Sequence, residues 1–255
     1  MLKIWSWKCF RSRYRNELIV SAFLFLGALA LYTVFGRALQ RTSVNNYRDF
    51  LFGMDIRRVI NDMTEFSANH VRTSVHPLYV LFVNPLGNAL TKIHLLRGAE
   101  YTVALIVDVF CGALCVVLAF VIFRLMSPKL LNPICLTLIF AFSMSPLLFS
   151  TTPETSDLAT CSLLVTYLLF WLNATTTHKI SLGMWIFAGV FSLGVTTTNF
   201  VQTLICFCFA RFSWRRRAAE GRKFLRSLGV MVGGVLAIGM LFALLQKAIY
   251  PSSPA

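Results

Sequence analysis

Long apolar runs with few or no charges constrain this chain more than any other feature. The first covers residues 18–36, and nineteen residues form a helix of about 28 Å, close to the ~30 Å hydrocarbon core of a bilayer. Further runs follow at residues 77–91, 101–123, 130–153, 158–177, 180–210 and 227–246. Only 13% of the residues are charged, against about a quarter in soluble domains. We therefore predict an all-α, polytopic transmembrane protein with about seven hydrophobic segments.

Basic residues gather beside the first and last apolar runs. They are Lys3, Lys8, Arg11, Arg13 and Arg15 before the first, and Arg211, Arg215, Arg216, Arg217, Arg222, Lys223 and Arg226 before the last. The positive-inside rule accounts for this pattern and places the N-terminus in the cytoplasm. We expect no nucleic-acid partner for the net charge of +14, because no basic stretch is interleaved with stacking aromatic residues in a soluble module.

We expect one transmembrane domain over residues 1–255. It comprises a basic cytoplasmic tail (1–16), a first span (17–39), an outer loop with the candidate active site (40–76) and the remaining membrane segments (77–250). The first span exceeds the roughly 7–15 apolar residues of a signal peptide, so we interpret it as an uncleaved signal anchor.

Two of the runs do not have the length of one span, and they leave two topologies open. Residues 77–91 would cover about 22 Å as a helix, and residues 180–210 roughly 46 Å with polar residues 196–199 at their middle. In the first topology 77–91 does not cross the bilayer and 180–210 is two short spans. In the second, 77–91 crosses and 180–210 is one tilted helix. Flanking charge slightly favours the first, which places Glu154 on the same face as Asp55.

Acidic residues concentrate in the first loop. The chain has ten, and four lie between positions 49 and 65: Asp49, Asp55, Asp62 and Glu65. The apolar spacing from residue 54 to 66 predicts a short amphipathic helix on the membrane surface. We interpret Asp62 and Glu65 as its solvated face and assign no role to Asp49. Asp55 follows Gly53 at the start of this helix, where a carboxylate either caps the helix or is aimed at a site.

Two further polar residues lie where the chain meets the membrane. His76 precedes Pro77, which suits the first turn of a helix, so we expect His76 at the interface as a structural residue or a donor to a phosphate. Asp108 lies within the run 101–123, and an intramembrane carboxylate is a functional candidate. Nothing at helical spacing completes a site around it, so we expect it to hydrogen-bond to Ser, Thr or Asn of a neighbouring helix.

Several stretches of the sequence, taken together, resemble those of a known class of membrane proteins. "TSVHPLYVLFVNPLG" follows a loop whose short amphipathic helix carries an acidic residue. "FRLMSPKLL", "LIFAFSMSPLLFSTTPETSDLATCSLL" and "FAGVFSLGVTTTNFVQTLICF" follow it in order. Over most of residues 17–210 these resemble the GT-C class of membrane glycosyltransferases, including protein O-mannosyltransferases and lipid A aminoarabinose transferases, which use polyprenyl-phosphate-linked sugars.

The chain departs from this class in two ways. Asn199 lies near the place where many members carry a lysine that could meet the lipid phosphate. The later spans and outer domain of many members are absent, so we expect a fragment, a minimal member or an inactive relative.

The resemblance implies transfer of a sugar from a polyprenyl-phosphate donor to an extracytoplasmic acceptor at the bacterial inner membrane, with inversion of the anomeric centre. It implies that Asp55 is the general base. The implied substrate-binding residues are Arg57, Arg58, Arg72 and His76 near the phosphate, and Glu154, which either orients a substrate or caps the following helix. We expect no cofactor and no metal, because no Asp-x-Asp pair occurs. The alternatives are a non-catalytic subunit of an envelope assembly complex and a transporter or flippase component.

Overall fold

A computed structural model of the chain describes residues 7–42, 55–68, 70, 75–93, 99–175, 180–211 and 218–250. These residues form ten α-helices and no strand: α1 (Trp7–Gln40), α2 (Ile56–Thr64), α3 (Tyr79–Thr91), α4 (Glu100–Met126), α5 (Leu131–Phe142), α6 (Met144–Phe149), α7 (Ser156–Thr175), α8 (Leu182–Val195), α9 (Thr197–Arg211) and α10 (Ala218–Ile249). The all-α prediction is confirmed for the described residues.

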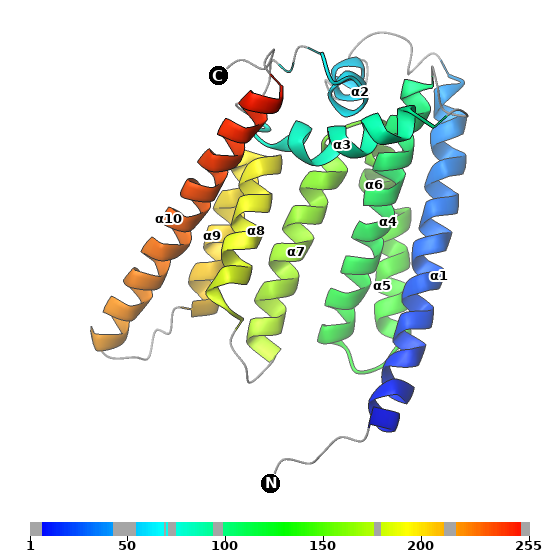
Figure 1. Cartoon of the computed structure of the whole chain (residues 1–255). Coiled ribbons are helices and arrows are strands. Elements are labelled where there is room, and N and C mark those ends of the chain that lie inside the picture. The colour runs from blue at the N-terminus through cyan, green and yellow to red at the C-terminus, as the bar shows by residue number, and fades with distance from the viewer. Residues whose placement is uncertain are drawn as a thin grey trace.

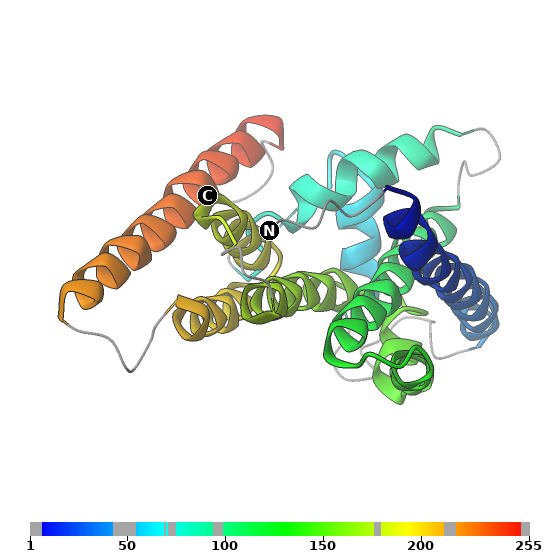
Figure 2. The same ribbon diagram turned by 90° about the horizontal axis from the view of Figure 1, so that it is seen from below.

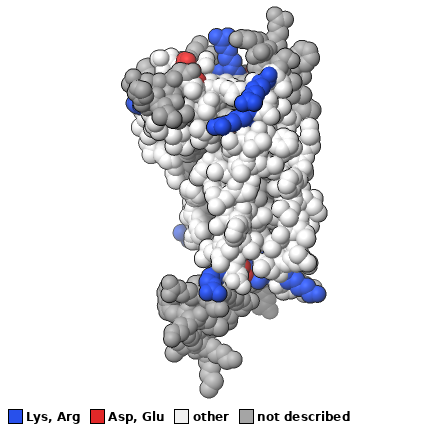
Figure 3. All heavy atoms as spheres, turned by 90° about the vertical axis from the view of Figure 1, so that its right-hand side faces the viewer, with Lys and Arg blue, Asp and Glu red and all other residues white. Residues whose placement is uncertain are grey.

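Four helices are long and apolar enough to cross a membrane. They are α1 from Arg15 onward, α4, α7, and α10 from Gly221 onward, and α5 and α8 are shorter apolar helices. Seen from the α1 side, the surface has a broad uncharged band with Lys and Arg toward its two ends (Figure 3). These features indicate an integral membrane protein.

The long helices run along one common direction, with α2 and α3 at one end of the bundle (Figure 1). We call this the α2 end; α1 begins at the opposite end (Figure 1). α4, α7 and α9 run away from the α2 end, and α5, α8 and α10 run toward it. Residues 150–155 and the turn between α8 and α9 therefore lie at the α2 end, whereas residues 127–130 lie at the opposite end (Figure 1). The first of the two topologies therefore describes the arrangement of the helices.

In place of the one tilted helix that the second topology expects over residues 180–210, the structure has two helices. α8 ends at Val195 and α9 begins at Thr197, because Thr196 adopts an extended conformation with φ −154° and ψ 123°. β-Branched threonines form helices less readily, and their hydroxyl groups compete for backbone hydrogen bonds. α3 lies across the end of the bundle instead of crossing it (Figure 1). It begins at Tyr79, two residues later than Pro77 predicts, and it continues through Pro85.

α2 packs on the outer side of α3. Val59 and Met63 of α2 form an apolar cluster with Tyr79 and Val83 of α3. A glycine permits the close approach, because a Cβ atom on Gly87 would lie only 2.1 Å from the carbonyl oxygen of Met63. Since no side chain fits into that space, Gly87 fixes how deeply α2 sits on α3.

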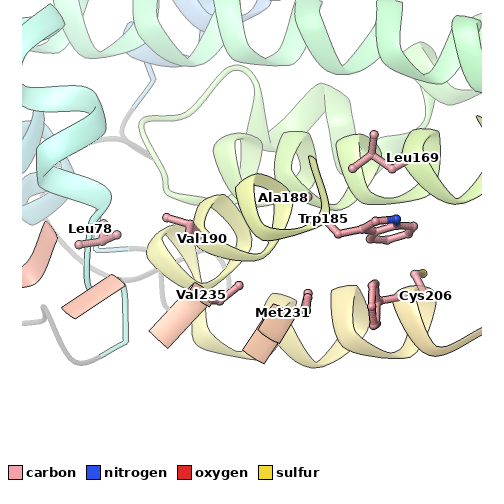
Figure 4. Close-up of a cluster of buried hydrophobic side chains, with 9 residues drawn as sticks. Leu78, Leu169, Trp185, Ala188, Val190, Cys206, Met231 and Val235 are labelled. Atoms are coloured by element: carbon pink, nitrogen blue, oxygen red, sulfur yellow. The ribbon is translucent and has the colours of Figure 1, made fainter. Parts of the chain in front are cut away.

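The largest buried cluster joins the second half of the chain to the His-Pro-Leu segment. It surrounds Trp185 and contains residues of α7, α8, α9 and α10, and Leu78 lies at its edge (Figure 4). Leu78 fits against Gly194, whose missing Cβ would lie 2.8 Å from the Leu78 side chain. Seen along the helices, α10 and α1 lie at the two extremes of the molecule (Figure 2).

Candidate functional site

Four side chains form a continuous series of hydrogen-bonded ion pairs, which we call the α2 charge chain: Asp55, Arg58, Asp62 and His70. Asp55 occupies the N-cap position of α2 without capping it, and its Oδ2 instead accepts from Arg58 Nε at 3.0 Å. Arg58 Nη1 donates to Asp62 Oδ2 at 2.9 Å. Asp62 Oδ1 lies 2.6 Å from His70 Nδ1, which must carry the proton because an ionised carboxylate only accepts.

The α2 charge chain runs from a partly exposed end to a buried one. The side chains of Asp55 and Arg58 are 23% and 21% exposed, whereas those of Asp62 and His70 are 5% and 0% exposed. The prediction that Asp62 belongs to the solvated face is therefore wrong, while Glu65 is exposed as predicted. Burial of Asp62 is tolerated because Arg58 and His70 both donate to its carboxylate.

Asn84 and Tyr250 hold the backbone around Asp62. Asn84 Nδ2 donates to the carbonyl oxygens of Asp62 and Glu65 at 3.0 and 3.1 Å. Asn84 Oδ1 accepts from the hydroxyl group of Tyr250, which directly follows α10, at 3.1 Å. The Tyr250 ring also contacts the edge of the His70 ring, with 5.3 Å between centroids. The end of α10 thus closes over the buried half of the charge chain.

His76 is held by the turn between α8 and α9. Its Nδ1 lies 2.7 Å from the carbonyl oxygen of Val195 and 3.3 Å from the Thr196 hydroxyl oxygen. The neighbouring backbone is held in the same place, since Leu78 N–H donates to Gly194 O at 2.7 Å. Nδ1 serves this structural contact, and Nε2 is the nitrogen of the half-buried ring that remains for another group.

A second group of polar side chains lies where residues 150–157 pack on α4. We call Asp108, Glu154, Asp157, Ser150 and Tyr79 the interior acidic cluster. Asp108 Oδ2 accepts the backbone N–H of Glu154 at 3.1 Å, so the expectation of a Ser, Thr or Asn partner is wrong. A Cβ on Gly112 would lie 2.2 Å from Ser150 Oγ and 2.9 Å from Asp157 Oδ2, so both side chains press against this glycine of α4.

The interior acidic cluster contains several buried polar atoms to which the described residues offer no hydrogen bond of normal geometry. They are Glu154 Oε2, Asp157 Oδ2, Ser150 Oγ and Tyr79 Oη. Glu154 uses its other oxygen locally, accepting from Thr155 N–H and the Thr155 hydroxyl group at 3.0 Å each. Among the described residues, no ion pair involves the carboxylate of Asp108, Glu154 or Asp157. Unpaired polar atoms of this kind are costly, at about 1–3 kcal/mol each.

Tyr79 connects the interior acidic cluster with α2. It is 1% exposed and packs with Val59 and Met63 of α2 and with Val107 of α4. Burial raises the pKa of its hydroxyl group well above the usual value of 10.0, and the charge of Asp108 adds to the shift. The charges of Glu154 and Asp62 make smaller contributions in the same direction.

The structure places the predicted site residues that it describes at the α2 end. Asp55 and Arg58 are in direct contact, His76 lies on the α8–α9 turn, Glu154 lies beside α4, and Arg57 is exposed. Arg72 and Asp49 lie outside the described residues. Asn199 links two helices, because its Nδ2 donates to Ala159 O at 3.0 Å and to Ser162 Oγ at 3.1 Å.

Sequence reasoning missed the importance of Asp62, His70, Asp157 and Tyr79. One signal was available for the interior acidic cluster: Asp108 and Gly112 are four residues apart and share a face of α4, so a polar segment could approach there. In the described part of the chain, no group of three or more His, Cys, Asp or Glu side chains is arranged to hold a metal ion. Compared with family models, curated proteins and solved structures, the chain shows no significant match.

Proposed function

We propose that this protein is a membrane glycosyltransferase of the GT-C type, which transfers a sugar from a polyprenyl-phosphate donor to an extracytoplasmic acceptor. In this proposal the α2 end faces the outside of a bacterial inner membrane and the opposite end faces the cytoplasm. The hydrophobic segments are then α1, α4, α5 with α6, α7, α8, α9 and α10.

The observation that carries the proposal is the presence of two acidic segments at the same end of the bundle. Residues 150–157 bring Glu154 and Asp157 against α4, and α2 brings Asp55 to the same end of the helices (Figure 1). Tyr79 packs against both segments, and carboxylates of both raise the pKa of its hydroxyl group. Such a place at the membrane surface suits a reaction between a lipid-linked donor and a polar acceptor.

The reaction requires a base for the acceptor and stabilisation of the leaving phosphate. The acceptor hydroxyl oxygen forms a bond to the anomeric carbon while its proton passes to a carboxylate, which we assign to Asp55. The bond from the anomeric carbon to the phosphate oxygen breaks, and polyprenyl phosphate leaves with the electron pair. Because attack and departure occur on opposite faces of the sugar, the configuration inverts.

The contacts of the cationic residues suggest different roles for them. Arg58 donates to both Asp55 and Asp62, so it is committed to the base and not to the substrate. Arg57 is exposed on the neighbouring face of α2 and is therefore the better candidate to meet a lipid phosphate. His76 has one ring nitrogen bound to Val195 O, and the other can donate to the phosphate.

The unpaired atoms of the interior acidic cluster support a binding site for hydroxyl groups. Sugar hydroxyls both donate and accept, so they can satisfy the carboxylates of Glu154 and Asp157 as well as the hydroxyl groups of Ser150 and Tyr79. We therefore assign Glu154 to orienting the sugar or the acceptor, as part of this cluster.

Replacement of Asp55 tests the proposal. In cells whose only copy of the gene encodes Asp55→Asn, we expect the sugar content of the cell surface that depends on this protein to fall about a hundredfold or more, because the base is lost. His76→Ala should give a smaller loss. The matched control is Glu65→Gln, which changes an exposed carboxylate just beyond the other end of α2 and should leave the glycans unchanged.

The measurement is mass spectrometry of surface glycans, together with immunoblotting of the membrane fraction. Unchanged glycans in Asp55→Asn cells that contain normal amounts of the inserted protein would show that the transferase proposal is wrong. Unchanged glycans together with loss of a partner complex would favour a non-catalytic subunit.

A further inference from the structure

We propose that Asp62 and His70 are positioning residues that hold the Asp55 carboxylate in place through Arg58. The inference rests on the proposed role of Asp55 as the general base. It adds two residues that do not touch the substrate but determine where the base points.

Arg58 connects the buried and exposed halves of the α2 charge chain. Its Nε donates to Asp55 and its Nη1 to Asp62, so one rigid guanidinium plane fixes the distance and direction between the two carboxylates. Asp55, Arg58 and Asp62 are three and four residues apart and therefore share one stripe of α2. Without Asp62, the long Arg58 side chain would be free to turn away and release the Asp55 carboxylate.

Asp62 is itself fixed from several sides. Its carboxylate accepts from Arg58 and His70, and its backbone carbonyl accepts from Asn84. His70 is 1% exposed, and the described residues offer its Nε2 no hydrogen-bond partner. The polar contact of the ring is therefore the bond from Nδ1 to Asp62 at 2.6 Å. A buried imidazole whose bonding is directed at one carboxylate serves to orient that carboxylate.

The surroundings of His70 offer an alternative role, which is packing alone. The Tyr250 ring lies 5.3 Å from His70 and 5.0 Å from Phe66, so the imidazole also fills space in an aromatic group. Asp62 supplies the ionised group of α2 that faces the ring, Tyr250 contributes a phenol from the end of α10, and Asn84 of α3 is neutral. Positioning and packing predict opposite orders of the sugar-transfer rate for two substitutions of His70.

His70→Asn and His70→Leu separate positioning from packing. In His70→Asn, the amide nitrogen lies about where Nδ1 was, so it can still donate to Asp62, but the side chain fills less space. In His70→Leu, the new side chain fills the apolar surroundings but cannot donate. If His70 positions the base, His70→Asn should keep sugar transfer within about threefold of the wild type, and His70→Leu should lose about tenfold or more. If His70 only packs, the order should be reversed.

The experiment measures incorporation of a radiolabelled precursor of the sugar that cells lacking the gene fail to incorporate into their surface glycans. Rates are divided by the amount of folded protein, taken from thermal unfolding of each full-length variant in detergent. Glu65→Gln is the matched control, because it changes an exposed carboxylate just beyond α2 and leaves the contacts of Asp62 and His70 intact. Its rate should match the wild type.

The outcomes distinguish this inference from the proposed function. If Asp55→Asn abolishes incorporation and His70→Leu does not reduce it, the positioning role is wrong and the transferase proposal stands. If Asp55→Asn has no effect, both are wrong. Should His70→Leu fail to fold, Asp62→Asn replaces it: a normal rate per folded molecule of Asp62→Asn overturns the inference, and a loss of about tenfold or more supports it.

Discussion

The two polar groups at the α2 end differ in how their charges are satisfied. In the α2 charge chain, every carboxylate has a cation or a histidine within 3.0 Å. In the interior acidic cluster, Asp108 accepts a backbone N–H, and oxygen atoms of Glu154 and Asp157 are buried without a hydrogen bond of normal geometry from the described residues. Both groups contain a buried carboxylate, Asp62 in one and Asp157 in the other, so their difference does not come from a difference in depth alone.

This difference indicates different tasks. A fully paired group loses conformational freedom, which suits residues that hold a base in one orientation. A group with unpaired buried atoms carries a cost that a bound ligand can remove, which suits residues that receive a substrate. The comparison predicts that removing a charge from the α2 charge chain should lower the free energy of unfolding. Removing a charge from the interior acidic cluster should leave it nearly unchanged.

Asp62→Asn should have the largest effect on stability. The amide removes the negative charge that Arg58 and His70 share, and it leaves buried donors without a strong acceptor. We expect the free energy of unfolding to fall by about 2–4 kcal/mol. Thermal or denaturant unfolding in detergent measures this, with Glu65→Gln as the exposed control. A loss below about 0.5 kcal/mol, the range of ordinary surface substitutions, would contradict a tightly paired charge chain.

Gly87→Ala tests how the charge chain is seated on α3. A Cβ there would overlap the Met63 carbonyl oxygen, which belongs to the backbone and cannot rotate away. We expect a loss of about 1–3 kcal/mol, because α2 must move outward. Gly27→Ala in α1 is the control, since nothing in the described structure lies within 4 Å of its Cβ position. Equal unfolding temperatures for the two variants would show that α2 is not held closely against α3.

The sequence predicted the arrangement of the helices better than the site. The length of the run 180–210 and its polar middle offered two short helices as the slightly favoured alternative, and the structure has the break at Thr196. The short run 77–91 likewise offered a segment that does not cross, and α3 lies across the end of the bundle (Figure 1). These follow from local length and polarity. The burial of Asp62 does not follow from the local sequence, because it depends on His70 and on Asn84. Tyr250, at the far end of the chain, holds Asn84 in place.

Helix periodicity also placed Asp62 on the wrong face for a physical reason. A short amphipathic helix alone on a membrane has one apolar and one wet side, but α2 packs on α3 and is covered by Phe66, His70 and Tyr250. Similarly, Asp108 accepts a hydrogen bond from the backbone N–H of Glu154, and a pattern of side chains cannot predict a backbone donor. Predictions from spacing fail where the partner is distant in sequence or belongs to the main chain.

Asp157→Asn examines the other half of the comparison. Asp157 Oδ2 is buried, and the described residues offer it neither a hydrogen bond of normal geometry nor a cation. Replacing it by the isosteric amide removes a charge that is costly to bury, so stability should stay the same or rise by up to about 1 kcal/mol. Unfolding in detergent, measured beside Asp62→Asn, gives the contrast. A loss as large as that of Asp62→Asn would mean that both groups are equally well paired.

Two tyrosines extend the same contrast to neutral groups, with the smallest expected effects. The hydroxyl group of Tyr250 donates to Asn84, whereas that of Tyr79 has no hydrogen-bond partner in the described part of the chain. At neutral pH, Tyr250→Phe should cost about 1 kcal/mol and Tyr79→Phe less than about 0.5 kcal/mol. Unfolding of the two variants in detergent measures the difference, and an equal loss in both would contradict it.

Alkaline pH provides a second measurement on the same pair. Burial raises the pKa of both phenols in the folded state, so folding favours their protonated forms. Their contribution to stability is complete below the unfolded pKa near 10 and is lost as the pH rises from there through the folded pKa. Unfolding temperatures between about pH 8 and 11 should therefore fall less steeply for Tyr79→Phe than for the wild type. Parallel curves for the two proteins would show that Tyr79 is not held as a neutral phenol beside the carboxylates.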